Sequence, residues 1–245
     1  MSTLYTKFLV EPIYNTLVAL FSIIPVADAG LAIIFITIIV RLILYPLSKK
    51  AVTAQIEMQN LAPELEQIKI KYKGNQEEQA RKTLALYKEK KVNPFSGILV
   101  LIVQLPVIFA LYKIFISTGF PTIDTTLLYS FVKVPGEVSA IFLGMDLTHK
   151  SIILAFLAAI TTYFQIKLAT PPTKKSSSGT PSFGDDLAKN MQAQMKYFFP
   201  VIVFFISYSI SGVIALYWFT TNLFTIGQEI IVRKRLKAQV SIPKA

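Results

Sequence analysis

The stretch IIFITIIVRLILYPLSKK, from Ile33 to Lys50, is apolar enough to cross a bilayer, yet it carries Arg41 in its interior. No acidic residue lies nearby in the sequence to neutralise this arginine. A charged side chain at the centre of a membrane helix costs roughly 2.5–3.5 kcal/mol on insertion scales. Snorkelling to the interface would cover only part of the distance. We therefore expect Arg41 to be hydrated or to serve a function.

The composition is that of an integral membrane protein. Of the 245 residues, 53% are hydrophobic and 16% are charged, and the mean hydropathy is +0.54. A soluble domain of this size carries about 25% charged residues. The absence of cysteine excludes disulfides and thiolate metal sites. The net charge of +11 would suggest nucleic acid in a soluble protein, but in a membrane protein its distribution sets the orientation, and we expect no DNA partner.

Hydropathy predicts an all-α membrane protein with a bundle of five spans. The last two spans come from one almost uncharged stretch of 36 residues, Tyr197 to Val232. As a single helix it would be about 54 Å long, which is too long for one crossing of about 30 Å, so the chain must turn back near Ser209–Gly212. The predicted spans are 29–48, 94–116, 148–169, 196–210 and 212–231.

The distribution of Lys and Arg predicts the orientation. Segments 49–91, 167–196 and 233–245 hold twenty of these residues, whereas 1–28 and 117–150 hold three. Cytoplasmic loops are enriched in Lys and Arg. We therefore expect a multi-pass protein of the cell (inner) membrane, with the N-terminus outside and the C-terminus in the cytoplasm.

The segments between the spans differ in kind. Residues 1–28 predict an amphipathic helix on the outer leaflet, although a sixth span is an alternative. Residues 49–93 predict a cytoplasmic antiparallel helical hairpin with its turn at KGNQ, which is either a docking arm or a solvated surface. The remaining segments are an extracytoplasmic loop (117–147), a flexible cytoplasmic loop rich in Pro, Ser and Gly (170–195) and a basic cytoplasmic tail (232–245).

Polar residues in other spans are candidate companions of Arg41. They lie on three further spans, and three of them, with Glu229, share one helical face of the last span. Thr37 lies one turn before Arg41 on the same face of its own span. Together they predict a water-filled cavity around the arginine. The candidate set is Arg41, Thr37, Gln104, Gln165, Trp218, Asn222 and Thr225.

Motifs of catalysis are absent from the sequence. There is no HExxH, no G-x-S-x-G and no Walker A motif, and the single histidine, His149, lies at the outer edge of the third span. We therefore expect a protein that is not an enzyme, with no catalytic residue, metal site or cofactor.

Several stretches resemble the YidC/Oxa/Alb insertase family. AIIFITIIVRLILYPLSKKAV resembles its first core span, and LALYKEKKVNPFSGILVLIVQLPVIFALY resembles its junction of cytoplasmic hairpin and second span. FLGMDLTHKS resembles the loop before the third span, and SGVIALYWFTTNLFTIGQEI the last span. The resemblance covers about Leu31 to Arg235.

This resemblance implies five helices around a hydrophilic groove that is open to cytoplasm and lipid, with Arg41 as the groove arginine. It implies an insertase and chaperone that draws the polar or acidic tail of a small membrane protein into the groove while the client's apolar span enters the lipid bilayer. The hairpin would recruit clients, the basic tail 233–244 would contact the ribosome, and the Sec translocon is a further candidate partner. Two alternatives remain open: an ion or small-solute channel or transporter in which Arg41 selects anions, and a passive scaffold in which Arg41 pairs with lipid phosphate.

Overall fold

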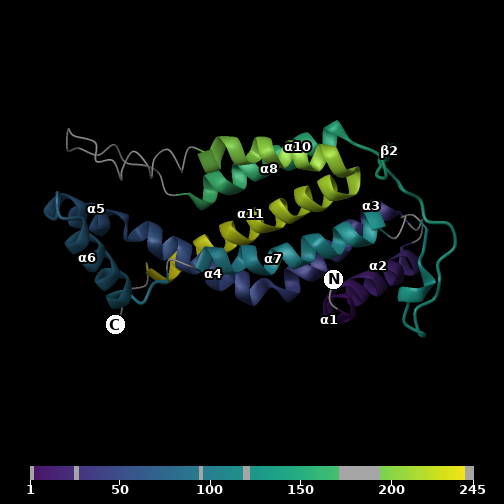
Figure 1. Ribbon diagram of the computed structural model, residues 1–245, viewed down its shortest axis with the longest axis horizontal. Coiled ribbons are helices and arrows are strands. Elements are labelled where there is room, and N and C mark those ends of the chain that lie inside the picture. The colour runs from purple at the N-terminus through teal and green to yellow at the C-terminus, as the bar shows by residue number, and fades with distance from the viewer. Residues whose placement is uncertain (1–2, 25–27, 94–95, 118–121, 171–193, 241–245) are drawn as a thin grey trace.

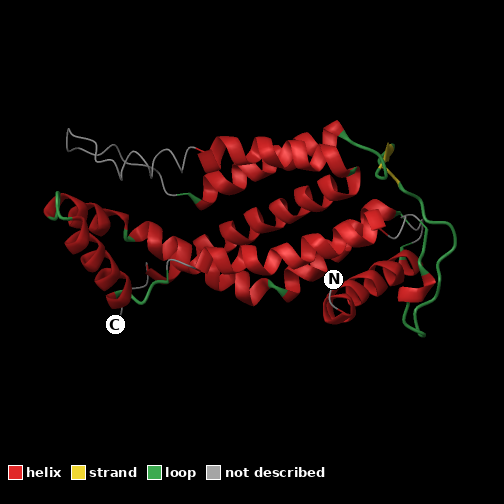
Figure 2. Ribbon diagram, in the orientation of Figure 1, coloured by secondary structure: helices red, strands yellow, loops and turns green. Residues whose placement is uncertain are grey.

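The computed structural model describes the chain except for residues 1–2, 25–27, 94–95, 118–121, 171–193 and 241–245. For residues 96–103, 116–117 and 237–240, the structure describes the helical backbone but not the side chains. Figure 2 shows that helices make up most of the described chain and that strands are confined to one small hairpin. The prediction of a mostly helical protein is confirmed. The loop predicted at 170–195 lies almost entirely outside the described residues.

The elements follow one another in chain order as labelled in Figure 1. They are α1 (Thr3–Tyr5), the π-helical η1 (Thr6–Val10), α2 (Glu11–Ile23), α3 (Ala29–Ile43), α4 (Tyr45–Asn60), α5 (Ala62–Lys71), α6 (Gln76–Glu89), α7 (Ser96–Tyr112), the π-helical η2 (Lys113–Ser117), the 3₁₀ turn η3 (Thr125–Leu127), β1 (Ile141–Phe142), β2 (Met145–Asp146), α8 (Ile152–Ala169), the π-helical η4 (Gln194–Phe198), α10 (Phe199–Ile210) and α11 (Gly212–Val240).

By length and apolar composition, α8 is the one described helix that is sufficient by itself to cross a membrane. The bent pair α3 and α4 also meets these criteria when it is taken together, and the segments 104–115 and 194–210 are shorter apolar helices. α11 is longer, with 29 residues, but it carries a row of polar side chains. The number of five spans stays a prediction.

The helix that carries Arg41 is shorter than the predicted span. Asp28 caps its start by accepting a hydrogen bond from the amide of Leu31 at 3.0 Å. The helix ends at Ile43, and α4 leaves Leu44 at an angle of 68°. Pro46 explains the break, because proline lacks an amide hydrogen and is tolerated only in the first turn of the new helix. Arg41 therefore lies in the last turn before a sharp bend.

The N-terminal helical segment packs along α3 and the described part of α7. Among the seven apolar residues that recur at helical spacing between Phe8 and Ile24, four are buried, Leu9 and Leu20 are half-buried, and Phe8 is 74% exposed. The hydroxyl of Tyr5 donates to the carbonyl of Pro106 in α7 at 2.9 Å. The buried face of the segment consists of Val10, Ile13, Tyr14, Leu17, Val18 and Phe21.

A second layer is formed by α8, α10 and α11, which lie side by side in Figure 1. α10 and α11 are antiparallel and meet at Ser211, within the predicted turn. The amide of Gly212 donates to the carbonyl of His149 at 2.8 Å, so the turn is tied to the loop before α8. α11 also packs on α3, which joins the two layers.

The predicted hairpin is present at the opposite end of the molecule from the β-strands (Figure 1). Its turn lies at residues 72–75, where Gly74 has a positive φ of 92° and Asn75 caps α6. Val52 and Ile56 on α4 pack against Val232 on α11, which fixes the base of the arm. Beyond Leu61, Ile70 and Leu84 are more than half exposed.

Candidate functional site

Arg41 is buried in the bundle without a counter-ion. Only 7% of its surface is exposed, and no residue of the described chain forms a hydrogen bond or an ion pair with it. The hydroxyl group of Tyr217 on α11 lies within electrostatic range of its charge. Removal of a guanidinium from water is costly unless another group compensates the charge. Among the described residues, the charge of Arg41 therefore has no anionic partner.

The hydroxyl of Tyr217 links Arg41 to a third helix. Gln104 on α7 donates a hydrogen bond from its Nε2 to this hydroxyl, and Tyr217 is 4% exposed. Arg41, Tyr217 and Gln104 thus form a polar cluster of α3, α11 and α7, which we call the arginine cluster. Tyr217 was absent from the predicted set, because the predicted face of α11 was centred on its neighbour Trp218.

Thr37, one turn before Arg41, is also buried, at 1% exposed. Its hydroxyl donates to the carbonyl of Ile33 in its own helix. Such a bond satisfies the hydroxyl donor locally and leaves the oxygen lone pairs available. Thr37 therefore lies one turn from Arg41 along α3, and no hydrogen bond joins it to the other described residues of the arginine cluster.

Asn222 belongs to a different cluster, between α11 and α8. Its amide donates to the hydroxyl of Thr162 at 2.8 Å and of Thr161 at 3.2 Å, and also to the carbonyl of Ala158 at 3.3 Å. It is 2% exposed. Polar side chains of this kind join helices in a membrane. The structure thus brings Gln104 to Arg41 through Tyr217 and places Asn222 on the packed interface with α8.

The other predicted residues are only partly enclosed. Trp218 and Gln165 are half-buried on α11 and α8, and Thr225 is half-buried with its hydroxyl bonded to the carbonyl of Thr221 at 2.9 Å. The hydroxyl oxygen of Thr221 is itself buried and has no hydrogen-bond partner among the described residues. An unpaired buried hydroxyl near Tyr217 adds to the polarity of this part of α11.

At the hairpin end, a polar cluster ties three helices together. Arg233 on α11 pairs with Glu229 at 2.7 Å, donates to Gln59 on α4 at 3.0 Å and donates to the carbonyl of Leu168 in α8 at 2.7 Å. Leu168 belongs to the last turn of α8, whose carbonyls have no partner within the helix. Arg233 therefore caps α8 and holds it to the base of the hairpin.

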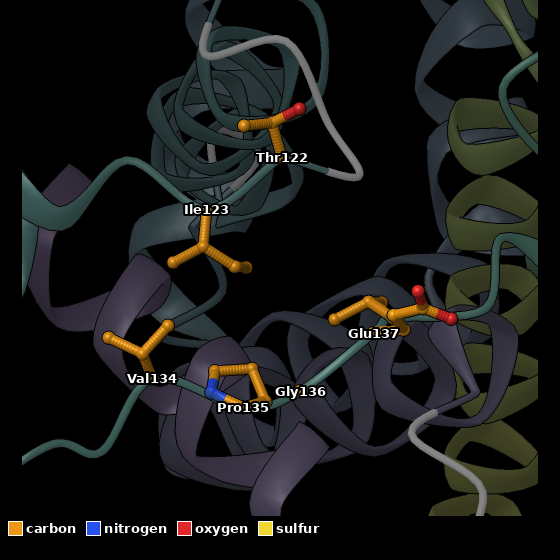
Figure 3. A pocket seen from close by; sticks show the side chains of 7 residues that line it. Thr122, Ile123, Val134, Pro135, Gly136 and Glu137 are labelled. Atoms are coloured by element: carbon orange, nitrogen blue, oxygen red, sulfur yellow. The ribbon is translucent and has the colours of Figure 1, made fainter.

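The end of the molecule that carries the β-strands contains no catalytic arrangement within the described chain. Asp146 Oδ2 and Thr148 Oγ1 both lie 3.0 Å from the same ring nitrogen of His149, Nδ1, so the histidine does not connect an acid to a nucleophile. No cluster of potential metal ligands is found among the described residues. Figure 3 shows a shallow hollow lined by residues 122–123 and 134–138 of the loop before β1, which is distinct from the helices of the arginine cluster.

Comparison with known proteins gives the family. The family model described as 60Kd inner membrane protein matches residues 19–239. The chain belongs to the YidC/Oxa/Alb family. It is 32% identical to the membrane protein insertase YidC of Clostridium tetani over 206 residues, which cover 84% of this chain and 81% of that protein. The family description indicates an inner membrane protein.

Longer relatives in the family share the same region. The chain is 28% identical to the membrane protein insertase YidC of Caulobacter vibrioides over 95% of its own length, and 31% identical to that of Francisella tularensis subsp. novicida over 87%. It spans 37% and 34% of the lengths of these two proteins. Each of the three alignments covers most of this chain.

Proposed function

We propose that this chain is a non-enzymatic insertase and chaperone that inserts small membrane proteins into the bilayer. The observation that carries the proposal is the burial of Arg41 without an anionic partner in the described chain, in a protein whose relatives are named membrane protein insertases. An acidic or polar tail of a client supplies the partner that the bundle itself does not. The client's apolar span meanwhile passes into lipid.

The arginine cluster is suited to hold such a tail briefly. Arg41 supplies up to five N–H donors, and the hydroxyl of Tyr217 and amide of Gln104 offer further polar contacts. Thr37 extends this polar surface along α3, and Gln165, Trp218 and Thr225 are the half-buried members that we assign to a groove open to lipid. Asn222 supports the groove through α8.

The proposed topology follows from the charge distribution. Five spans place the N-terminus outside and the hairpin and C-terminus in the cytoplasm, with the N-terminal helical segment on the outer leaflet. The hairpin with its exposed Ile70 and Leu84 recruits clients. The basic end of α11 contacts the ribosome, and the Sec translocon is a further partner for longer clients.

The test is rescue of a cell depleted of its own insertase. Wild-type chain, Arg41→Ala and Arg41→Lys are expressed, and insertion of a single-span client with an acidic translocated tail is measured by protease accessibility. Wild type should rescue, Arg41→Lys should retain much of the activity because it keeps the charge, and Arg41→Ala should be strongly impaired.

Lys113→Gln is the matched control, since it removes a cation from α7's extension that bonds only Thr6 among the described residues, at 3.2 Å. Equal rescue by Arg41→Ala at equal membrane levels would show that Arg41 does not serve the client. Failure of properly inserted wild type would contradict the insertase function. Chloride flux in proteoliposomes that depends on Arg41 would favour a channel instead.

A further inference from the structure

The β1–β2 hairpin ends in an exposed leucine with a strained backbone. Leu143 has a φ of 49° and Gly144 a φ of 78°, as a two-residue type I′ turn requires at both central positions. Asn, Asp or Gly is preferred at the first of these, because a side chain branched or bulky near the backbone is disfavoured at positive φ. Leu143 is nevertheless 80% exposed. The side chain of Leu143 thus neither favours this turn conformation nor packs in the core.

The base of the same hairpin is fixed firmly to the bundle. Phe142 packs so closely on Gly30 at the start of α3 that a Cβ at this glycine would overlap the ring. Leu147 is fully buried, and its carbonyl accepts from the amide of Val213 in α11 at 3.1 Å. The direction in which the tip points is therefore set by the protein, and the exposure of Leu143 is not that of a loose loop.

The hairpin is joined to the lipid-facing surface of α8. Ser151, which caps α8, donates its hydroxyl to the sulfur of Met145 in β2 at 3.7 Å. The first turns of α8 then expose Ile152, Ile153 and Phe156, each by about 60% of its surface. Since α8 is apolar and long enough to span the membrane, this exposed face is a lipid face.

The level of the membrane surface near the hairpin is marked by a second contact. The ammonium group of Lys150 lies 5.9 Å from the centre of the Tyr208 ring, at the end of α10. Tyrosine and lysine gather at membrane–water interfaces. Lys150 lies four residues beyond β2, so the hairpin is close to the interfacial level and its apolar tip is within reach of the acyl chains.

We propose that the β1–β2 hairpin is a lipid anchor, which inserts Leu143, with Ile141 beside it, into the leaflet at the N-terminal end of α8. The ligand is the boundary between headgroups and acyl chains, where an apolar side chain gains free energy on leaving water. Oδ1 of Asp146, opposite Ile141, accepts bonds from the amide and hydroxyl of Thr148, and Oδ2 lies 3.0 Å from Nδ1 of His149, so both oxygens have partners near this boundary. Ile141 is 59% exposed.

The anchor goes beyond insertion of clients, because it concerns how the outer end of the bundle is held. Through Phe142 on Gly30 and Leu147 on α11, a hairpin held by lipid also holds the start of α3 and the turn between α10 and α11. The strain at Leu143 is then retained because a glycine or asparagine there would relax the turn but lose the anchor.

The experiment uses the absence of cysteine from the chain. Leu143→Cys is labelled with an environment-sensitive fluorophore in the full chain, which is reconstituted in liposomes with and without phospholipids brominated near the headgroup end of the acyl chain. Glu137→Cys, an exposed position in the same loop, is the matched control. We expect a blue-shifted emission at 143 and a larger loss of fluorescence with brominated lipid than at 137. Aqueous iodide should give the reverse order.

Equal quenching of both positions by iodide, without quenching by brominated lipid, would overturn the proposal. Protection of position 143 from both quenchers would also overturn it, and would show that a protein partner or a second copy covers the tip. As a second measurement, Leu143→Gln, which keeps a side chain of similar size at the same positive φ but makes its end polar, should increase amide exchange of residues 141–146 in liposomes while that of α8 is unchanged. Unchanged exchange in the hairpin would contradict an anchoring role.

Discussion

The amide of Gln104 donates a hydrogen bond to the hydroxyl of Tyr217, and this bond joins α7 to α11 beside the buried charge of Arg41. The two residues are 113 positions apart in the sequence, and their bond couples the two helices at the position where the proposed client tail binds. Hydrogen bonds between membrane helices contribute about 0.6 kcal/mol on average and up to about 1.7 kcal/mol. The bond therefore serves to orient the cluster more than to stabilise the bundle.

Tyr217→Phe should accordingly reduce client insertion more than stability. Loss of the hydroxyl removes the partner of Gln104 and the group that interacts with Arg41, while the ring remains in place. We expect a destabilisation of about 0.5–2 kcal/mol. A double-mutant cycle with Gln104→Leu, followed by unfolding in mixed micelles, should give a coupling energy near that of one interhelical bond. A coupling energy of zero would show that the two side chains act independently.

Gly212→Ala should destabilise the turn between α10 and α11. A Cβ at this position would lie 3.1 Å from the Cα and 3.2 Å from the carbonyl oxygen of Leu147, and these backbone atoms cannot rotate away. Overpacking of this kind typically costs about 1–3 kcal/mol. Gly136→Ala is the matched control, because an added Cβ there meets no atom within 4 Å. Equal melting temperatures for the two variants in detergent would contradict this packing.

Arg233→Lys should loosen the base of the hairpin. A lysine keeps the charge but cannot contact Glu229, Gln59 and the carbonyl of Leu168 at once, because it lacks the planar fork of guanidinium donors. We expect a loss of about 1–3 kcal/mol and faster amide exchange near Gln59. The exposed neighbour Lys234, changed to alanine, should leave both quantities unchanged.

Acid should weaken the loop that precedes α8. Hydrogen bonds from Thr148 lower the pKa of Asp146 below its ordinary value of 3.8. The unfolded chain then binds the proton more tightly than the folded one, so this contribution to stability is present above the ordinary value and is lost as the pH falls through the lowered value. Asp146→Asn should flatten this acid limb of the stability curve in detergent. A limb that is equally steep in the variant would assign it to other carboxyl groups.

The sequence predicted the elements whose signals are local. The KGNQ turn and the turn near Ser209–Gly212 follow from residues that act within a few positions, and both turns are observed. The importance of Arg41 followed from the cost of a charge in an apolar helix, and its burial agrees with that argument.

Long-range partners could not be predicted in the same way. The predicted amphipathic helix over residues 1–28 gave no reason for Asn15 to be buried, yet it is buried, because its amide and oxygen bond to Leu127 and Tyr129, more than a hundred residues away. Tyr217 is buried within electrostatic range of Arg41, whereas the predicted Trp218 is only half-buried. Helical periodicity gives the angles between the side chains of one helix, but it does not say which of them face a particular neighbouring helix.

The hairpin is an arm that is fixed at one end, because Leu61 at the end of α4 is buried, with 6% of its surface exposed, whereas Ile70 and Leu84 beyond it are exposed. α4 is held to α11 by Val52 and Ile56 and, near its end, by the bond between Gln59 and Arg233. The part of the arm beyond this contact is α5 with the antiparallel α6, and it is about 15 Å long for the ten residues of α5. Under the proposed function, a client must therefore come within about this distance of the fixed base to meet Ile70 and Leu84.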